Sequence, residues 1–281
     1  MADAYPFVKG HGTENDFVLL PDHDGTVHGE LAPERMAERV AALCDRRAGL
    51  GGDGVIRVVR TAVLGIEQEA EWFMDYRNSD GSLSEMCGNG IRVLGRHLAD
   101  EGLVDTSAPV PVGTLDGVKT LTFADDGTIT VDMGGPRLLG ESKVAVGDRS
   151  WPAAHVDMGN PHAVAFVESL DDAGTLHDEP TYDAGTYPHG VNIEFVVRRG
   201  PGHVAFRVHE RGSGETRSCG TGACAVMVAA AVADGVDGPP TEDLAYRVDV
   251  PGGALTVTWT STDRALLTGP AVLVARGTTN L

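Results

Sequence analysis

The sequence predicts an α/β (α+β) protein of two pseudo-symmetric mixed-sheet domains, each wrapped around a central helix, with the active site in the cleft between them. Short β-rich segments alternate with a few helices, and 281 residues suffice for two domains of ordinary size. Segment 73–90 also aligns without gaps on segment 205–222, with Cys87 over Cys219. A repeat of about 130 residues is too long for a solenoid unit, so it indicates two like domains.

The repeat sets the expected domain boundaries at 1–132 and 133–266. Helices are predicted over 33–47, where Pro33 is a start signal, and over 91–100 and 222–233. The other expected elements are strands over 54–60 and 69–78, a hairpin over 119–133 with an Asp-Gly turn, and strands within 151–167, 191–199, 203–215, 246–250, 253–260 and 267–277.

Charge and composition exclude several classes of partner. With 41 acidic against 22 basic residues the net charge is −19, which repels phosphate backbones and anionic headgroups, so neither nucleic acid nor membrane is expected as a partner. The N-terminus lacks a basic, apolar leader, and the longest apolar stretch, 223–233, is too short to span a bilayer. We therefore expect a cytoplasmic protein.

The four cysteines are too few for a disulfide framework in a chain of this length, and no CxxC motif is present to bind zinc. No metal site is predicted. Cys44 shares a helical apolar stripe with Met36, Val40 and Leu43, so it is expected in the core.

Cys87 and Cys219 each open a Cys-Gly-Xaa-Gly sequence just before a predicted helix. A helix N-terminus presents unpaired N–H groups and partial positive charge, which biases a thiol toward the reactive thiolate. Two such thiols facing one cleft suit stereoinversion at an amino-acid Cα, because one can remove a proton while the other supplies one. Backbone N–H groups at both helix starts are expected to hold the substrate carboxylate: those of Gly88, Asn89, Gly220 and Thr221.

Two further side chains are predicted to tune the pKa values of these thiols. His162 follows Asn160 in a polar turn between two strands, and Glu210 stands where Asn78 stands in the first repeat. No lysine lies in a context suited to a Schiff base, so no cofactor is expected. The remaining histidines considered are expected to be surface or core residues: His28, His97, His177, His189 and His203.

Eight motifs follow one another along nearly the whole chain: HGTENDF (11–17), GGDG (51–54), RNSDGS (77–82), EMCGNGIR (85–92), MGNPH (158–162), VNIEF (191–195), ERGSGET (210–216) and SCGTGACA (218–225). Together they resemble the diaminopimelate epimerase family. The resemblance implies cofactor-independent interconversion of LL- and meso-2,6-diaminopimelate in the biosynthesis of lysine and cell-wall precursors. It also implies that the last strand, about 267–281, packs back on the first domain, and that the protein is a homodimer.

Carried over motif by motif, the resemblance makes Cys87 and Cys219 the catalytic acid–base pair. Arg211 suits a distal carboxylate because its guanidinium binds carboxylates bidentately. Asparagines suit a zwitterion because they donate and accept hydrogen bonds without adding charge. The side chains implied to contact the substrate are Asn15, Asn78, Asn160, Asn192, Glu210 and Arg211.

The sequence departs from the family pattern at two positions. Gly54 stands where some members carry a substrate-binding glutamine, so one side-chain contact is missing or replaced, and Asp53 beside it has no assigned role. Ala275 stands where the family often has a tyrosine that packs in the dimer.

Other functions remain open at this point. Proline racemase-like and hydroxyproline epimerase-like enzymes also use opposed cysteines, whereas a phenazine-pathway isomerase-like branch has lost them. Thiol redox sensing is disfavoured by the missing CxxC motif and by the wide separation of Cys87 and Cys219 in the sequence. A module that only binds amino acids would need no cysteine at either helix start.

Overall fold

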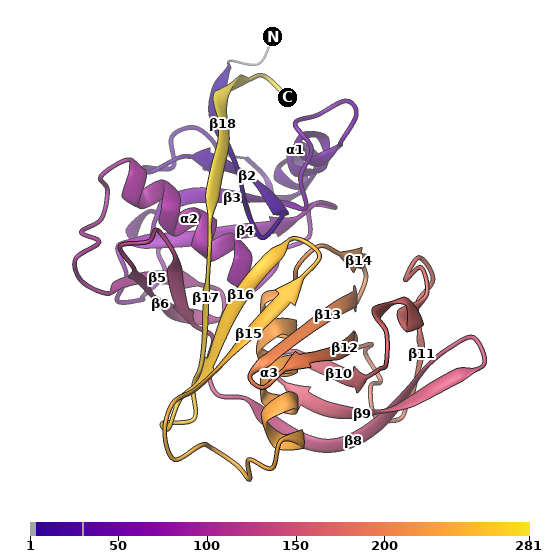
Figure 1. Ribbon diagram of the computed structural model, residues 1–281. Coiled ribbons are helices and arrows are strands. Elements are labelled where there is room, and N and C mark those ends of the chain that lie inside the picture. Colours follow the sequence, from indigo (N-terminus) through magenta and orange to yellow (C-terminus); the bar gives the residue numbers. More distant parts are fainter. Residues whose placement is uncertain (1–3, 30) are drawn as a thin grey trace. The chain divides into compact units, whose positions relative to one another are not determined.

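The computed structural model describes residues 4–29 and 31–281, and the chain divides into two compact units (Figure 1). The first unit comprises Met1–Val131 with Pro270–Leu281, and the second comprises Asp132–Gly269. The C-terminal segment thus belongs to the same unit as the N-terminal half of the chain.

The first unit holds a mixed sheet in the order β18-β1-β2-β3-β4-β5-β6-β7. The pairs β2–β3 and β4–β5 are parallel and all other neighbours are antiparallel. Parallel neighbours need a crossover, and α1 and α2 lie in these two connections. The strands are β1 (Tyr5–Gly12), β2 (Asn15–Pro21), β3 (Gly54–Arg60), β4 (Trp72–Asn78), β5 (Val110–Thr114), β6 (Gly117–Phe123), β7 (Ile129–Asp132) and β18 (Val272–Thr279).

Helix α1 (Pro33–Cys44) begins at the predicted proline but ends before the predicted Arg47. Asp45 follows it, and its carboxylate accepts the backbone N–H groups of Arg47 and Ala48, each at 2.7 Å, which turns the chain away from the helix axis. Cys44 is buried in the core with the rest of its stripe, as predicted. A short 3-10 helix (Thr61–Leu64) follows β3.

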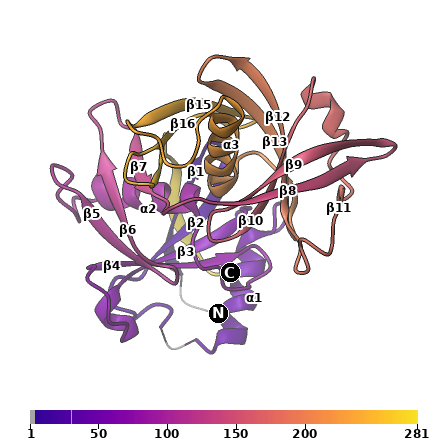
Figure 2. The ribbon, with the colours of Figure 1, turned by 90° about the horizontal axis from the view of Figure 1, so that it is seen from below.

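The second unit repeats this plan in the order β8-β9-β10-β12-β13-β15-β16-β17, with β10–β12 and β13–β15 parallel. Figure 2 shows the long antiparallel hairpin β8–β9. The strands are β8 (Arg137–Val146), β9 (Arg149–Asp157), β10 (Pro161–Phe166), β12 (Asn192–Gly200), β13 (His203–Glu210), β15 (Leu244–Val250), β16 (Gly253–Trp259) and β17 (Ala265–Gly269), with short β11 (Thr181–Tyr182) beside β8 and β14 (Gly214–Thr216) beside β13.

The two units therefore share one arrangement of eight strands, with parallel pairs at the same two places. In each unit a buried helix lies in the connection between the two strands of the second parallel pair. This helix is α2 (Gly88–Asp100) between β4 and β5, and α3 (Gly220–Ala233) between β13 and β15. The predicted mixed α/β fold with an internal repeat is confirmed.

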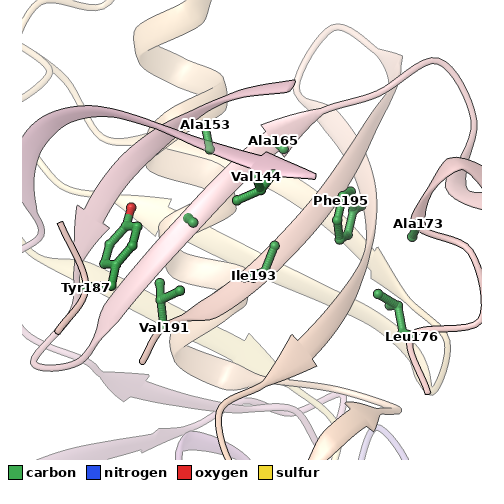
Figure 3. Close-up of a cluster of buried hydrophobic side chains, with 10 residues drawn as sticks. Val144, Ala153, Ala165, Ala173, Leu176, Tyr187, Val191, Ile193 and Phe195 are labelled. Carbon is green, nitrogen blue, oxygen red and sulfur yellow. The ribbon is translucent and has the colours of Figure 1, made fainter. Parts of the chain in front are cut away.

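Helix α3 is apolar on all sides and almost entirely buried, as expected for a helix that a sheet surrounds. It contacts β9, β10, β12, β13, β15, β16 and β17. On the other side of this sheet lies a second cluster of buried side chains, among them Val144, Ile193 and Phe195 (Figure 3). A 3-10 helix (Leu170–Ala173) with a capping box at Ser169 borders that cluster. Core side chains on both faces of the sheet fix the ends of β10, β12 and β13, where His162, Asn192 and Glu210 lie.

Candidate active site

Cys87 and Cys219 are the N-cap residues of α2 and α3. Each helix begins before its predicted start, at Gly88 and Gly220, so the cysteines stand directly at the first turn. Each has extended backbone angles, and each Sγ accepts a backbone N–H three residues on, at 3.4 Å: Gly90 for Cys87 and Gly222 for Cys219. Both sulfurs thus occupy the position of an N-cap acceptor, where the helix dipole favours negative charge.

Asn15 contacts Cys87 in the first unit. The Cys87 thiol donates to Asn15 Oδ1 at 3.7 Å, and the same oxygen accepts Asn89 Nδ2 at 3.1 Å. Asn15 follows a two-residue turn in which Thr13 and Glu14 both have positive φ, 49° and 61°. Non-glycine residues rarely adopt this conformation, and a β-branched threonine least of all, so the turn that delivers Asn15 is strained.

Charged residues bind both ends of the hydrogen-bonded pair that Asn15 and Asn89 form. Asn15 Nδ2 donates to Asp53 Oδ2 at 2.7 Å, and the fully buried Arg92 donates to Asn89 Oδ1 at 2.9 Å and to the Gly88 carbonyl at 3.1 Å. Sequence reasoning left Asp53 without a role and did not single out Arg92. Their position in the motifs GGDG and EMCGNGIR is the only signal the sequence offers.

Asn78 and Gly54 lie side by side at the ends of β4 and β3. The Asn78 side chain donates to Ser82 Oγ at 3.0 Å, and its backbone N–H donates to the Ser82 carbonyl, so it shapes the following turn. A side chain at position 54 would meet Tyr76 and the Arg77 carbonyl, both within 2.6 Å of its Cβ. Tyr76 therefore occupies the space next to Gly54, and no residue larger than glycine fits there.

Cys219 lies in a more buried and more acidic environment. Its Sγ is 3.6 Å from Thr221 Oγ1, and only 7% of the residue is exposed. Burial raises the pKa of the Cys219 thiol well above its usual range, and the carboxylates of Glu210 and Glu194 raise it further. The prediction that the helix start biases the thiol toward thiolate is therefore wrong for Cys219, because desolvation and two carboxylates outweigh the N-terminal N–H groups.

A buried pair, Glu194 and His162, supports the start of α3. Glu194 Oε1 lies 2.6 Å from His162 Nδ1, and both side chains are fully buried. His162 Nε2 is 3.1 Å from Asn160 Oδ1, and Asn160 Nδ2 donates to Thr221 Oγ1 at 3.3 Å. Burial raises the pKa of Glu194, and the adjacent His162 opposes this shift.

The structure thus joins two predicted residues, His162 and Asn160, to Thr221 beside Cys219, and it adds Glu194, which sequence reasoning missed. The hydrogen bonds of the His162 ring go to Glu194 and Asn160, and not to Cys219. The available signal was the alternation of VNIEF, which points the glutamate of this strand inward.

Asn192, Glu210 and Arg211 lie at the ends of β12 and β13. Asn192 Oδ1 accepts the Arg211 backbone N–H at 3.0 Å, and the exposed Arg211 guanidinium donates to the His189 carbonyl at 3.1 Å. The Thr216 hydroxyl donates to the Glu210 carboxylate. Asn192 therefore anchors the backbone from which the Arg211 side chain projects.

The strand registers show that His162 holds the position in the second unit that Phe17 holds in the first, and that Glu194 holds the position of Ile56. His162 faces Asn192 across a parallel pair, as Phe17 faces Gly54, and Glu194 lies two residues beyond, as Ile56 does. Phe17 and Ile56 are buried beneath Gly90 of α2, whereas Glu194 lies beneath Gly222 of α3. One copy of the repeat supports its helix start with hydrocarbon, and the other supports it with an acid–histidine pair.

This difference predicts unequal effects of adding a methyl group at the equivalent glycines. A Cβ at Gly222 would lie 2.8 Å from Glu194 Oε1 and 3.2 Å from Cys219 Sγ, whereas a Cβ at Gly90 meets the flexible end of Met74 at 2.8 Å. We expect Gly222→Ala to lower the free energy of unfolding by about 1–3 kcal/mol. Gly90→Ala should cost less, and chemical denaturation of both variants measures the difference. Equal losses would contradict the rigid support of α3 by Glu194.

The other two cysteines are buried in the core. Cys44 is the last residue of α1, where burial raises its thiol pKa to about 12, and Cys224 is fully buried within α3. Within residues 4–29 and 31–281, no group of three His, Cys, Asp or Glu side chains is arranged to hold a metal ion. None of the helices in these ranges is long and apolar enough to cross a bilayer.

Solved structures with the same fold belong to a class that includes epimerases and phenazine-biosynthesis proteins. A PhzF-family phenazine biosynthesis protein from Bacillus anthracis superposes with a TM-score of 0.73 and 17% identity, covering 99% of this chain and 100% of its own. A hydroxyproline epimerase from Agrobacterium vitis superposes with a TM-score of 0.70 and 14% identity, covering 100% and 94%. At such identities these likenesses show the fold.

The sequence itself is more specific. Residues 7–139 and 154–274 match the family model for diaminopimelate epimerase. A diaminopimelate epimerase from Streptomyces coelicolor is 57% identical over 284 residues, covering 99% of this chain and 96% of the relative, and one from Thermobifida fusca is 47% identical over 283 residues, covering 98% of each. The chain therefore belongs to the diaminopimelate epimerase family. The resemblance inferred from the motifs is confirmed, and so is the predicted enzyme class, an isomerase.

Proposed function

We propose that this enzyme interconverts LL- and meso-2,6-diaminopimelate without a cofactor, and that Cys87 and Cys219 act as its acid–base pair on opposite faces of one Cα. The observation that carries the proposal is the occurrence of a cysteine N-cap at the equivalent helix start of both repeats. Family membership supports the substrate, and the opposed-thiol chemistry follows from the pair.

In this mechanism a thiolate removes the Cα proton while the opposite thiol delivers a proton to the other face. One S–H bond forms and one breaks, so the enzyme ends with the same number of protons and the roles exchange for the reverse reaction. The difficult species is the carbanion. N–H groups in the first turns of α2 and α3, at Gly88, Asn89, Gly220 and Thr221, would stabilise the charge that develops on its carboxylate.

The distal amino-acid head of the substrate requires groups for a carboxylate and an ammonium. Arg211 suits the carboxylate because it is exposed and its backbone is anchored by Asn192. Glu210 suits the ammonium because it is a carboxylate one residue away. We assign Asn15, Asn78 and Asn160 to the neutral polar contacts with the zwitterion.

We further propose that the enzyme works in the cytoplasm, in lysine and cell-wall precursor biosynthesis, as a homodimer. The apolar side chains that β18 exposes support the dimer: Val272 is 44% exposed and Val274 is 55% exposed, beside Ala275. Exposed valines on a strand are a common interface feature. Sedimentation of the purified protein tests the oligomeric state.

The decisive experiment incubates the protein with LL-diaminopimelate in D₂O and resolves the stereoisomers. We expect the meso isomer to accumulate and deuterium to enter at Cα. No conversion, together with activity on proline or hydroxyproline, would instead identify a racemase of a cyclic substrate. The absence of both conversion and isotope exchange would favour a redox or binding role.

Alkylation of the thiols provides a second measurement in the same preparation. Diaminopimelate should protect Cys87 from iodoacetamide, as detected by peptide mass spectrometry, whereas Cys219, which is buried and has a raised pKa, should react slowly with or without substrate. Cys44 is the internal control, because its raised pKa keeps it protonated and unreactive with or without substrate. Substrate protection at Cys44 alone would contradict the proposed site.

A further inference from the structure

We propose that Asp53 is a positioning residue for Cys87: it fixes the orientation of the Asn15 amide so that a carbonyl oxygen, and not an NH₂ group, faces the thiol. Asp53 had no assigned role in the sequence, and its carboxylate does not contact Cys87 directly. Its effect on Cys87 passes through Asn15.

The orientation of Asn15 follows from the chemistry of Asp53. An ionised carboxylate only accepts hydrogen bonds, so the atom of Asn15 that lies 2.7 Å from Asp53 Oδ2 must be the donor Nδ2. The opposite atom of the amide is then Oδ1. This oxygen lies 3.7 Å from Cys87 Sγ and can accept the proton of the thiol.

The other end of the chain of contacts gives the same orientation independently. Arg92 only donates hydrogen bonds, so the atom of Asn89 that lies 2.9 Å from Arg92 Nη2 must be Oδ1. Asn89 therefore presents Nδ2 to Asn15 at 3.1 Å, which again requires the Asn15 oxygen on that side. A carboxylate at one end and a guanidinium at the other set the direction of both amides between them.

Asp53 is itself held in place. Its Oδ1 accepts Arg46 Nη2 at 2.7 Å, and its Oδ2 also accepts the Asp16 backbone N–H at 3.0 Å. The Asp16 carboxylate binds Lys9 and the same Arg46, but it does not contact Asn15. The charged residues in and next to these segments of the first unit include Lys9, Glu14, Asp16, Arg46, Asp53, Arg77, Glu85 and Arg92.

The orientation matters for the proton that Cys87 must carry. The Gly90 N–H donates to Sγ and favours the thiolate, whereas the Asn15 oxygen accepts S–H and favours the thiol. With the amide turned over, the Asn15 NH₂ group would face the sulfur beside the Gly90 N–H, and the thiol form would lose the Asn15 oxygen as an acceptor. Asp53 therefore keeps Cys87 able to exist in both protonation states, which a residue that alternates between acid and base requires.

The test compares Asp53→Ala with Asp53→Asn by following the pH profile of Cys87 alkylation without substrate, using peptide mass spectrometry. Asparagine keeps one oxygen that can accept Asn15 Nδ2 and the Asp16 N–H, but it loses the charge and the oxygen that accepts Arg46, whereas alanine loses both oxygens. We expect the midpoint of the profile to fall by about one pH unit in Asp53→Ala and by clearly less in Asp53→Asn. Asp16→Asn, which removes a neighbouring charge that does not touch Asn15, should match Asp53→Asn or the parent enzyme.

Identical midpoints for Asp53→Ala and Asp53→Asn would overturn the proposal. A shift in Asp16→Asn as large as that in Asp53→Ala would also overturn it, because charge alone would then explain the effect. If Asp53→Ala does not fold, Asn15→Ala is the alternative variant, because it removes the oxygen that accepts the Cys87 thiol and should lower the midpoint. An unchanged midpoint in Asn15→Ala would also overturn the proposal. The importance of the proton for catalysis rests on the function proposed above. The titration needs no substrate, so a missing epimerase activity with the expected shift would reject the function and leave the positioning role intact.

Discussion

Cys87→Ala and Cys219→Ala are each expected to abolish stereoinversion of diaminopimelate while the fold remains intact. Removing a positioned acid or base costs about 10²–10⁴-fold in rate, and inversion needs both groups because each serves one face of the carbon. The N-cap sulfur also supports its helix, so alanine should lower the free energy of unfolding by about 0.5–2 kcal/mol. Serine at the same position keeps an N-cap acceptor, and Cys→Ser variants therefore separate catalysis from stability.

Isotope exchange makes this prediction more specific. With one thiol removed, the remaining one can still take a proton from its own face and return another to the same face. We expect each single variant to incorporate deuterium, if at all, into one stereoisomer only, without inversion. Cys44→Ala and Cys224→Ala are the matched controls, because both thiols are buried in the core and should affect stability alone. Full epimerase activity in Cys87→Ala would rule out the two-thiol assignment.

Glu194→Ala should produce the largest loss of stability of any single substitution considered. The carboxylate is fully buried against His162 Nδ1 at 2.6 Å, and breaking a buried ionic pair by removing one partner costs about 3–5 kcal/mol. Part of that cost is the cavity, and part is the imidazole left without its partner. Urea denaturation of the purified protein measures the loss.

Glu215→Ala is the control for this prediction. Glu215 pairs with Arg207 on a partly exposed strand of the same unit, where removing an ion pair costs at most about 1 kcal/mol. Glu194→Gln keeps the shape and a hydrogen bond, so it should be less destabilising than alanine. Equal stability losses in Glu194→Ala and Glu215→Ala would show that the acid–histidine pair contributes little to the unit.

Several features of the site could be predicted from the sequence because they are local or repeated. A Cys-Gly-Xaa-Gly before a helical pattern places the sulfur at a helix start whatever the rest of the fold does, and the gap-free alignment of two segments predicts a duplicated arrangement of strands. Both depend on the spacing of residues along the chain. The predicted helix ends were less accurate than the helices themselves. At these ends the side chains of Cys87, Cys219 and Asp45 form hydrogen bonds with nearby backbone groups, which the helical pattern of the sequence does not show.

Contacts between distant segments could not be predicted. Glu194 is one of many glutamates in the chain, and its role arises because β10 and β12 are parallel neighbours in a register that brings it to His162. Asn15 was predicted to contact substrate, but the structure also brings it to Cys87 and Asp53, which are 72 and 38 positions away in the chain. Burial of Cys219, together with the nearby carboxylates of Glu210 and Glu194, raised its pKa against the expected direction for the same reason.

The sequence by itself determined the family, the mixed α/β fold, the duplication and the two thiols at helix starts, because these follow from residue order and periodicity. Only the tertiary structure decided how the two copies differ: a hydrocarbon support beneath α2 and an acid–histidine pair beneath α3. The physical reason is that burial and electrostatic environment depend on which strands pair, and strand pairing joins residues that no local pattern connects.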